Sequence, residues 1–240
     1  MSSNSVTSKA AAIDVRPFAS LGKANHGWLE ANHHFSFAGY YDPERMGHGN
    51  IRVWNDDDIA AQSGFPPHSH DNMEIITYVR EGAITHRDSM GNVGRTKAGD
   101  VQVMSAGTGV QHSEFNLEDV SCRLFQIWIL PRERNVRPHW DQKEFLSKDA
   151  SGFTVLASGY DDDKALAINA DARVFGAKMA AGESIHHVIK DDRHAYLVVS
   201  KGRISIGNTI LSERDGVAIS AGNLQLIALD DAEVVMVDSA

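Results

Sequence analysis

Short apolar segments, each bounded by turn residues, recur along this chain of 240 residues from about residue 25 onward. Ile75–Val79, Val101–Met104 and Cys122–Leu130 are typical, because each is rich in the β-branched and aromatic residues that favour strands. Strands this short, spaced roughly 8–12 residues apart with few helical stretches between them, are typical of sandwiches and barrels. The sequence therefore predicts an all-β fold.

The segments fall into two groups, separated by a less regular stretch that contains Pro131 and Pro138. The second group has no proline, and Gly207-Asn208 marks a hairpin within it. The strands expected there are Ala172–Met179, Ala195–Ser200, Arg203–Ile206, Val217–Ser220, Leu224–Leu229 and Glu233–Val237. We expect a flexible tail over residues 1–24, a domain over 25–132, a linker over 133–150 and a second domain over 151–240. Within the linker, Asp141–Ser147 has room for one or two helical turns.

The composition argues against several kinds of protein. With 23 Lys and Arg against 32 Asp and Glu, the net charge of −9 argues against direct nucleic-acid binding, which depends on clustered basic side chains. No apolar run reaches the length of about 18 residues that a transmembrane helix needs, so no membrane span is expected. The polar N-terminus lacks the pattern of a signal peptide, and the single cysteine, Cys122, suits a reducing compartment. We expect a cytoplasmic protein.

Two short motifs, drawn from a total of 12 histidines, bring potential metal ligands together. His68 and His70 are separated by one residue, and so are His112 and Glu114. Residues i and i+2 of a strand point to the same face, so each pair projects from one side of its strand. Two adjacent strands carrying these pairs would offer three nitrogens and one oxygen to a first-row divalent metal, with coordination positions left open. The sequence thus predicts one metal site.

Glu74 leaves the identity of the oxygen ligand open on spacing alone. It has the same strand parity as His68 and His70 if that strand continues unbroken, so it could replace Glu114 as a ligand. Alternatively, Glu74 lies behind the metal as a carboxylate that is hydrogen-bonded to a ligating imidazole.

The two motifs resemble those of the cupin superfamily. His68-x-His70-x3-Glu74, followed by Gly82, is similar to the first cupin motif. Gly99-x12-His112-x3-Asn116 is similar to the second, although it is longer than usual and lacks the usual proline. More specifically, residues 25–132 resemble the pirin family of bicupins. The matching segments are Asn25–Trp28, Phe35–Phe37, Tyr40–Pro43, His68–His70, Met73–Ile75, Glu81-Gly82, His86–Asn92, Ser105–Gly109, His112–Glu114 and Gln126–Trp128.

This resemblance implies two β-sandwich or jelly-roll barrel domains packed together, with a metal-binding first cupin and a degenerate second one. In pirins a His-x-His pair and a His-x-Glu pair hold the metal, which implies the ligands His68, His70, His112 and Glu114. Pocket walls are expected from Phe65, Phe115 and Trp128. One departure from the family is Pro66-Pro67 before His68, where relatives usually have a glycine-containing segment, and the prolines stiffen this approach to the pocket.

The resemblance also implies quercetin 2,3-dioxygenase activity, in which O2 opens the ring of a flavonol. The expected cofactor is one divalent transition metal; Fe(II) is favoured, and Mn, Co, Ni, Cu or Zn also fit these ligands. The metal would bind the 3-hydroxyl oxygen of this aromatic substrate, and Glu114 or Glu74 would take its proton. The alternative is a metal-binding regulatory protein that acts through a protein partner. We expect a monomer in either case.

The other candidates receive structural interpretations. His86 lies in a His-Arg-Asp-Ser sequence without the Gly-x-Ser-x-Gly elbow of a hydrolase, so it is expected to be structural or to line the pocket edge. The acidic runs Asp56–Asp58 and Asp161–Asp163 are interpreted as solvated loops. Adjacent His186 and His187 would face opposite sides of a strand, so no second metal site is expected.

Overall fold

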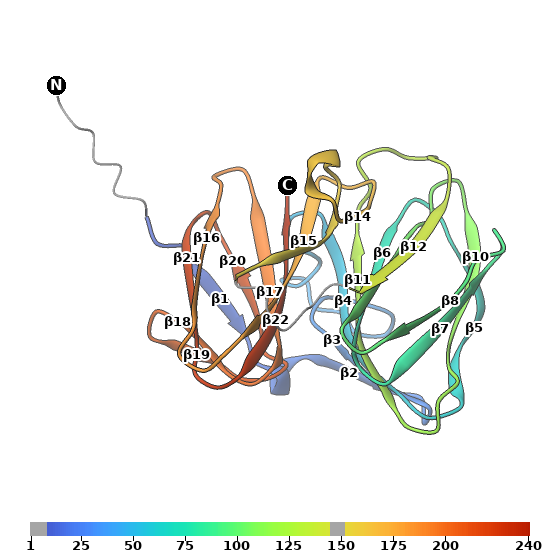
Figure 1. Cartoon of the computed structure of the whole chain (residues 1–240), viewed down its shortest axis with the longest axis horizontal. Coiled ribbons are helices and arrows are strands. Elements are labelled where there is room, and N and C mark those ends of the chain that lie inside the picture. The colour runs from blue at the N-terminus through green and yellow to red at the C-terminus, as the bar shows by residue number, and fades with distance from the viewer. Residues whose placement is uncertain (1–8, 145–151) are drawn as a thin grey trace.

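Strands dominate the structure, a computed structural model that describes residues 9–144 and 152–240 (Figure 1). The strands up to residue 144 are β1 (Ile13–Arg16), β2 (Gly22–Asn25), β3 (Leu29–His33), β4 (Ile51–Ile59), β5 (Ser63–His70), β6 (Glu74–Glu81), β7 (Ala83–Asp88), β8 (Val93–Lys97), β9 (Asp100–Ser105), β10 (Val110–Asn116), β11 (Cys122–Ile129) and β12 (His139–Glu144). Those after residue 152 are β13 (Thr154–Ser158), β14 (Leu166–Ala167), β15 (Ala172–Met179), β16 (Ser184–Ile189), β17 (His194–Lys201), β18 (Ile204–Ile206), β19 (Thr209–Leu211), β20 (Gly216–Ile219), β21 (Gly222–Ala228) and β22 (Ala232–Ser239). Every strand predicted above is present, so the all-β prediction is confirmed.

Helical structure is confined, among the described residues, to two three-residue 3₁₀ turns. These are η1 (Phe18–Ser20) and η2 (Asp161–Asp163). Neither turn approaches the length of a membrane-spanning helix, and no longer helix is found in residues 9–144 and 152–240. The helical turns expected over Asp141–Ser147 are wrong up to Glu144, where the chain forms β12; residues 145–147 lie outside the described part.

Two β-sandwiches make up the molecule, and each pairs a seven-stranded sheet with a four-stranded one (Figure 1). The sheets of the N-terminal sandwich have the orders β12-β9-β6-β11-β4-β3-β2 and β5-β10-β7-β8. Those of the C-terminal sandwich have the orders β1-β20-β17-β22-β15-β13-β14 and β16-β21-β18-β19. Corresponding strands take the same places in both, so the second sandwich repeats the architecture of the first.

The edge strands β1 and β12 show where the expected domain limits differ from the structure. β1 pairs antiparallel with β20 and so belongs to the C-terminal sandwich, although it lies at the start of the chain. Ile13 and Val15 pack against that sandwich's apolar core, which explains why this segment is a strand and not a flexible tail. β12, within the expected linker, pairs with β9 and completes the N-terminal sandwich. Residues 1–8 lie outside the described part.

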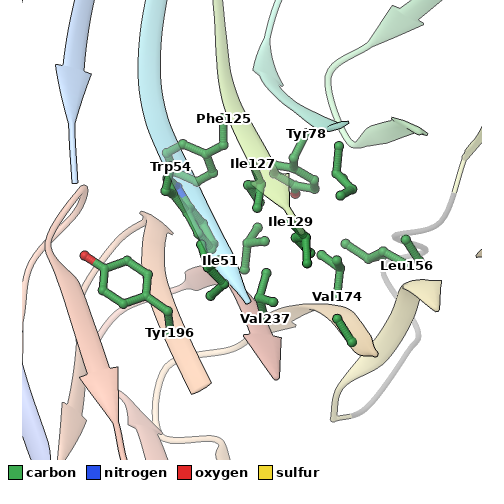
Figure 2. Close-up of a cluster of buried hydrophobic side chains, with 14 of the residues drawn as sticks. Ile51, Trp54, Tyr78, Phe125, Ile127, Ile129, Leu156, Val174, Tyr196 and Val237 are labelled. Atoms are coloured by element: carbon green, nitrogen blue, oxygen red, sulfur yellow. The ribbon is translucent and has the colours of Figure 1, made fainter. Parts of the chain in front are cut away.

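The largest apolar cluster lies between the two seven-stranded sheets and joins the sandwiches (Figure 2). Trp54, Phe125 and Ile127 enter it from the N-terminal sandwich, and Tyr196 and Val237 enter it from the C-terminal one. The rings of Trp54 and Tyr196 contact each other across this boundary, with centroids 5.5 Å apart. Because each large apolar side chain contributes about 1.5–3 kcal/mol when fully buried, this shared cluster stabilises the packing of the two sandwiches against each other.

The interiors of the two sandwiches differ in kind. A single continuous apolar cluster fills the C-terminal sandwich between its sheets, with Phe175, Leu197 and Leu226 among its members. The N-terminal sandwich instead contains two smaller apolar clusters, one around Ile84 and the other around Met104. Buried polar side chains fill part of this interior in place of a continuous apolar cluster. The N-terminal sandwich can therefore hold a polar site.

The acidic run Asp56–Asp58 is not a solvated loop, because it lies within β4 in the centre of a sheet. Asp56 is fully buried and accepts ion pairs from Arg80 at 2.9 Å and from Arg214 at 2.6 Å. Arg214 comes from the C-terminal sandwich, so this carboxylate links the two halves of the molecule. The sequence interpretation failed because the arginines that neutralise Asp56 are distant in sequence.

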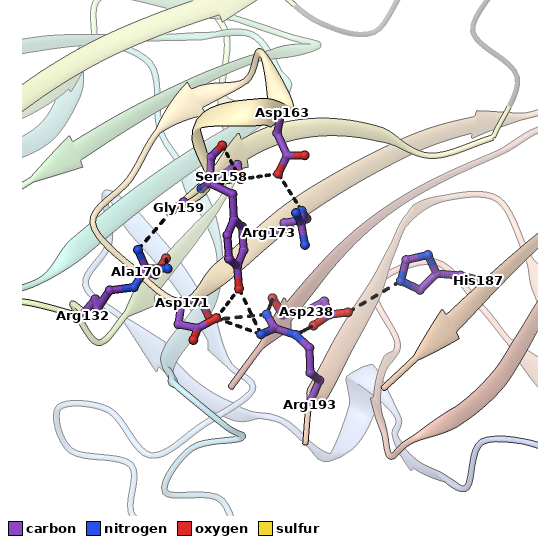
Figure 3. A network of polar contacts seen from close by, with 11 residues as sticks. Arg132, Ser158, Gly159, Asp163, Ala170, Asp171, Arg173, His187, Arg193 and Asp238 are labelled. Carbon is purple, nitrogen blue, oxygen red and sulfur yellow. Dashed lines mark hydrogen bonds and ion pairs between the residues drawn. The ribbon is translucent and has the colours of Figure 1, made fainter. Parts of the chain in front are cut away.

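A second polar network fixes the segment that leads into the C-terminal sandwich (Figure 3). Arg193 donates to both Asp171 and Asp238, and Tyr160 donates its hydroxyl to Asp171. Arg132, which follows β11, donates to the carbonyl of Gly159 at 3.2 Å. This network ties the segment to the sheet and to the N-terminal sandwich, and it gives these charged groups a structural role.

Candidate metal centre

The pairing of β5 with β10 brings three predicted ligands together inside the N-terminal sandwich. His112 lies directly opposite His68 in the register of the two strands. Their Nε2 atoms are 3.1 Å apart, and one ligand atom from each of His68, His70 and His112 lies within 4.8 Å of the others. The i, i+2 alternation predicted from the sequence therefore produces this convergence.

A β-bulge precedes the histidines on β5. The register shifts so that Glu114 lies opposite Phe65, although His112 lies opposite His68. Pro66 and Pro67 together lie opposite the single residue Ser113. Prolines lack N–H groups and are tolerated in sheets chiefly at bulges and edges. The bulge turns Phe65 to the side of the histidines, where its ring centroid lies 6.2 Å from that of His68. The two prolines thus shape the edge of the site.

Two of the histidines, His70 and His112, have the neutral state that metal ligands require. Burial, reinforced by the neighbouring histidines, lowers the pKa of His112 to about 2 and that of His70 to about 4, so both rings are neutral at physiological pH. His68 donates its Nδ1–H to the carbonyl of Pro66 at 2.8 Å, which leaves the Nε2 lone pair facing His112. Neutral imidazoles with converging lone pairs fit a divalent transition metal.

Glu114 lies beside the histidine group and is held by amide side chains. Its Oε1 accepts a hydrogen bond from Gln102 at 2.5 Å, and its Oε2 accepts one from Gln126 at 2.5 Å. Burial raises the pKa of Glu114 to about 7, although these hydrogen bonds act in the opposite direction. One oxygen of its carboxylate lies within 4.8 Å of ligand atoms of His112 and His86. His68 and His70 instead form a second group with His112. His112 therefore connects the two groups.

Glu74 is in neither group. It is fully buried at the start of β6, where its Oε2 accepts hydrogen bonds from Ser105 Oγ at 2.5 Å and from the backbone N–H of Asn169 at 2.9 Å. Asn169 belongs to the C-terminal half of the chain, so Glu74 joins the two sandwiches. The break at residues 71–73 between β5 and β6 ends the strand parity on which its candidacy as a ligand depended.

Aromatic side chains line one side of the histidine group. Trp128, which is predicted to line the pocket, packs edge-on against His70 with ring centroids 5.0 Å apart. Phe65 makes a more distant, tilted contact with His68, with ring centroids 6.2 Å apart, and it also packs against Trp28. Phe115 does not fit the prediction, because alternation along β10 puts it on the opposite face from His112 and Glu114. A surface pocket of about 350 Å³ adjoins His70.

The equivalent strand pair of the C-terminal sandwich has lost this arrangement. β16 and β21 pair as β5 and β10 do, with His187 opposite Leu224 and Ile185 opposite Leu226. His187 packs between Phe153 and Phe175 and lies 3.7 Å from the Asp238 carboxylate. Among the described residues of this sandwich, no group of three potential ligands was found.

The sequence predicts no role for Gln102 or Gln126, and for His86 it predicts a structural role or a place at the pocket edge. Gln102 and Gln126 each lie in a strand of mainly apolar residues, where a buried amide was the available signal. His86 is fully buried, and its ring stacks on Trp140 at 4.9 Å and 11°, which Gly94 permits because any side chain there would overlap the indole. These partners come from β7, β9, β11 and β12, so only the folded sheets bring them together.

Two sandwiches of matching topology, with one histidine and carboxylate cluster in the first, define the molecule as a bicupin. The chain belongs to the pirin family: the family profile described as Pirin matches residues 14–129, and that of the quercetinase C-terminal cupin domain matches residues 155–239. The resemblance inferred from the motifs is thereby confirmed.

Similar proteins cover nearly the whole chain. A protein of Pseudomonas aeruginosa, provisionally named quercetin 2,3-dioxygenase PA1210, is 56% identical over 231 residues, which are 95% of this chain and 100% of that protein. A pirin-like protein of Caulobacter vibrioides is 54% identical over 231 residues, with coverage of 95% and 100%. The crystal structure of the bacterial pirin YhhW from Escherichia coli in complex with nickel(II) has a TM-score of 0.90 at 39% identity, covering 95% of this chain and 99% of that one.

Proposed function

We propose that this protein is a metal-dependent dioxygenase that opens the ring of a flavonol such as quercetin with O2. The observation that carries the proposal is the convergence of His68, His70 and His112 ligand atoms within 4.8 Å, next to the buried carboxylate Glu114. The names of relatives support this substrate class, since one from Escherichia coli, 41% identical over 228 residues, is called quercetin 2,3-dioxygenase.

The site would hold one divalent transition metal through His68, His70, His112 and Glu114. Three neutral imidazoles and one carboxylate around a divalent ion leave a net charge of about +1, which favours an anionic oxygen ligand. When bound, the metal would attract the hydroxyl oxygen of the flavonol and lower the pKa of that hydroxyl. We propose Fe(II) because it suits reactions with O2, and nickel is the first alternative, given the nickel complex of the related YhhW.

The protein's own residues would bind the substrate and take up its proton. We assign Glu114 as the proton acceptor, because it is the carboxylate that groups with the ligand His112. Trp128 and Phe65, which lie against His70 and His68, offer apolar surfaces on which a flat aromatic substrate can pack. These rings would also keep water away from the reacting atoms.

Anaerobic mixing of the Fe(II)-loaded protein with quercetin tests this function. We expect a shift of the quercetin absorption to longer wavelength, followed by ring opening and O2 uptake when O2 is admitted. His70→Ala should abolish both signals, while His186→Ala, which changes an exposed histidine of β16, should retain them. A wild-type protein that gives neither a metal-dependent shift nor turnover contradicts the proposal.

The second candidate function is regulation: the metal-bearing protein would act by binding a protein partner. The supporting observation is a set of exposed apolar side chains in the four-stranded sheet of the C-terminal sandwich, namely Val188, Ile210 and Ile227. Exposed apolar patches on proteins often mark contacts with other proteins. Recovery of one stoichiometric partner whose binding depends on the metal, together with negligible quercetin turnover, would favour this function over the enzyme.

A further inference from the structure

His112 uses both of its ring nitrogens, and the two point to different partners. Its Nε2 faces the Nε2 of His68 at 3.1 Å, on the side of the predicted ligands. Its Nδ1 faces the Nδ1 of His86 at 3.4 Å, on the other side. His86 in turn places its Nε2 at 3.0 Å from Oδ2 of Asp88. A continuous row of polar atoms therefore runs from Asp88 through His86 and His112 to the metal site.

The proton positions along this row follow from Asp88. Its Oδ1 accepts from the backbone N–H groups of Met90 at 2.9 Å and Asn92 at 3.0 Å, and its Oδ2 accepts from the side-chain amide of Asn92 at 2.9 Å. Hydrogen bonds donated to a carboxylate favour its charged form, so Asp88 is an ionised carboxylate that only accepts hydrogen bonds. The hydrogen bond with His86 must then be donated by its Nε2–H.

This assignment fixes the tautomers of both histidines. A neutral imidazole with its proton on Nε2 has a lone pair on Nδ1, so His86 Nδ1 accepts the hydrogen bond shared with His112. His112 is then protonated on Nδ1, and its Nε2 lone pair faces the site. In the other tautomer, His112 would donate its Nε2–H to His68 Nε2 across 3.1 Å, and both ligand nitrogens would be occupied by one hydrogen bond.

We propose that Asp88 and His86 are positioning residues that hold His112 in the tautomer able to bind the metal. The proposal rests on the metal site of the proposed function, but not on the identity of the metal or of the substrate. Partners that orient a ligating histidine typically change metal affinity by about 10–100-fold when they are lost. Here the carboxylate acts through a second imidazole, which Trp140 holds by stacking.

The Asp88→Asn variant is the sharpest test, because it replaces one oxygen by an NH2 group of the same size. Two backbone N–H groups contact Oδ1 of Asp88, so the amide oxygen of the variant should stay there and its NH2 group should take the Oδ2 position. That NH2 would donate to His86 Nε2, move the His86 proton to Nδ1, and drive the His112 proton to Nε2. Asp141→Asn, an exposed aspartate of β12, is the matched control.

Nitrogen-15 NMR of the histidine rings in the metal-free protein reads these tautomers directly and needs neither metal nor activity. We expect His112 to carry its proton on Nδ1 in the wild type and in Asp141→Asn, and on Nε2 in Asp88→Asn. A wild-type His112 protonated on Nε2, or a tautomer that Asp88→Asn leaves unchanged, would overturn the proposal. A correct tautomer without quercetin turnover would instead contradict only the proposed function.

Ni²⁺ titration provides the second measurement, and a pair of His86 variants separates hydrogen bonding from packing. His86→Asn retains an acceptor for His112 Nδ1–H, whereas His86→Leu has a similar volume and no acceptor. We expect the Kd for Ni²⁺ to rise at least about tenfold in Asp88→Asn and His86→Leu, and less than about threefold in His86→Asn. Equal weakening in both His86 variants would overturn the proposal, and this comparison remains decisive if Asp88→Asn does not fold.

Discussion

His68 and His112 face each other across the ladder of β5 and β10, with their Nε2 atoms 3.1 Å apart. Two ring nitrogens that present lone pairs to each other at this distance repel, and a cation between or beside them removes that repulsion. The backbone register alone sets this pair opposite each other. The convergence of these potential metal ligands is therefore a consequence of strand pairing.

The first prediction concerns the amides that hold Glu114. Gln126→Leu removes the donor to Glu114 Oε2 and leaves that oxygen buried without this hydrogen bond. The metal-free protein should lose about 1–3 kcal/mol of unfolding free energy, which urea denaturation measures. Gln225→Leu, an exposed glutamine on β21, should change stability by less than about 0.5 kcal/mol. Equal effects of the two substitutions would show that the amide does not support Glu114.

The second prediction concerns acid sensitivity at the boundary between the sandwiches. His34 is fully buried, hydrogen-bonded to the Tyr196 hydroxyl at 2.8 Å, and burial lowers its pKa to about 3. Between pH 6.5 and 3 the unfolded chain takes up a proton that the folded protein excludes. Stability should therefore fall with decreasing pH by about 1.4 kcal/mol per pH unit from this residue.

Two variants isolate that contribution. Tyr196→Phe removes the hydrogen bond but keeps His34 buried, so it should retain the acid dependence. His34→Leu combined with Tyr196→Phe should reduce the slope of unfolding free energy against pH below 6.5 by about 1.4 kcal/mol per unit. The same slope in both variants would contradict a buried, neutral His34.

The third prediction separates Glu74 from the metal ligands. Burial raises the pKa of Glu74 to about 7, against the opposing hydrogen bonds from Ser105 and Asn169. The folded protein thus retains this proton at a pH where the unfolded chain has lost it, and stability declines as pH rises from about 4.5 through 7. Glu74→Gln should stabilise the protein by about 1–3 kcal/mol at pH 8 and change it little at pH 4.5. It should also leave metal binding intact, and loss of the metal would show that Glu74 is a ligand.

The sequence predicted what depends on local periodicity. Alternation along single strands was enough to place His68 with His70 and His112 with Glu114, and to locate most strands. It could not predict pairing between segments distant in the chain. β1 pairs with β20, a strand that lies about 200 residues later in the chain. Asp56 can be buried because Arg214 reaches it from the other sandwich. The amides around Glu114 and the row from Asp88 to His112 depend on the same long-range pairing.

Elemental analysis of the protein after reconstitution with a divalent metal and removal of excess ion tests the metal site most directly. The wild type should retain one metal ion per chain, and the variant with His68→Ala, His70→Ala and His112→Ala should retain none. His186→Ala should behave as the wild type does. A wild type that retains no metal, or a triple variant that retains as much as the wild type, would contradict the account.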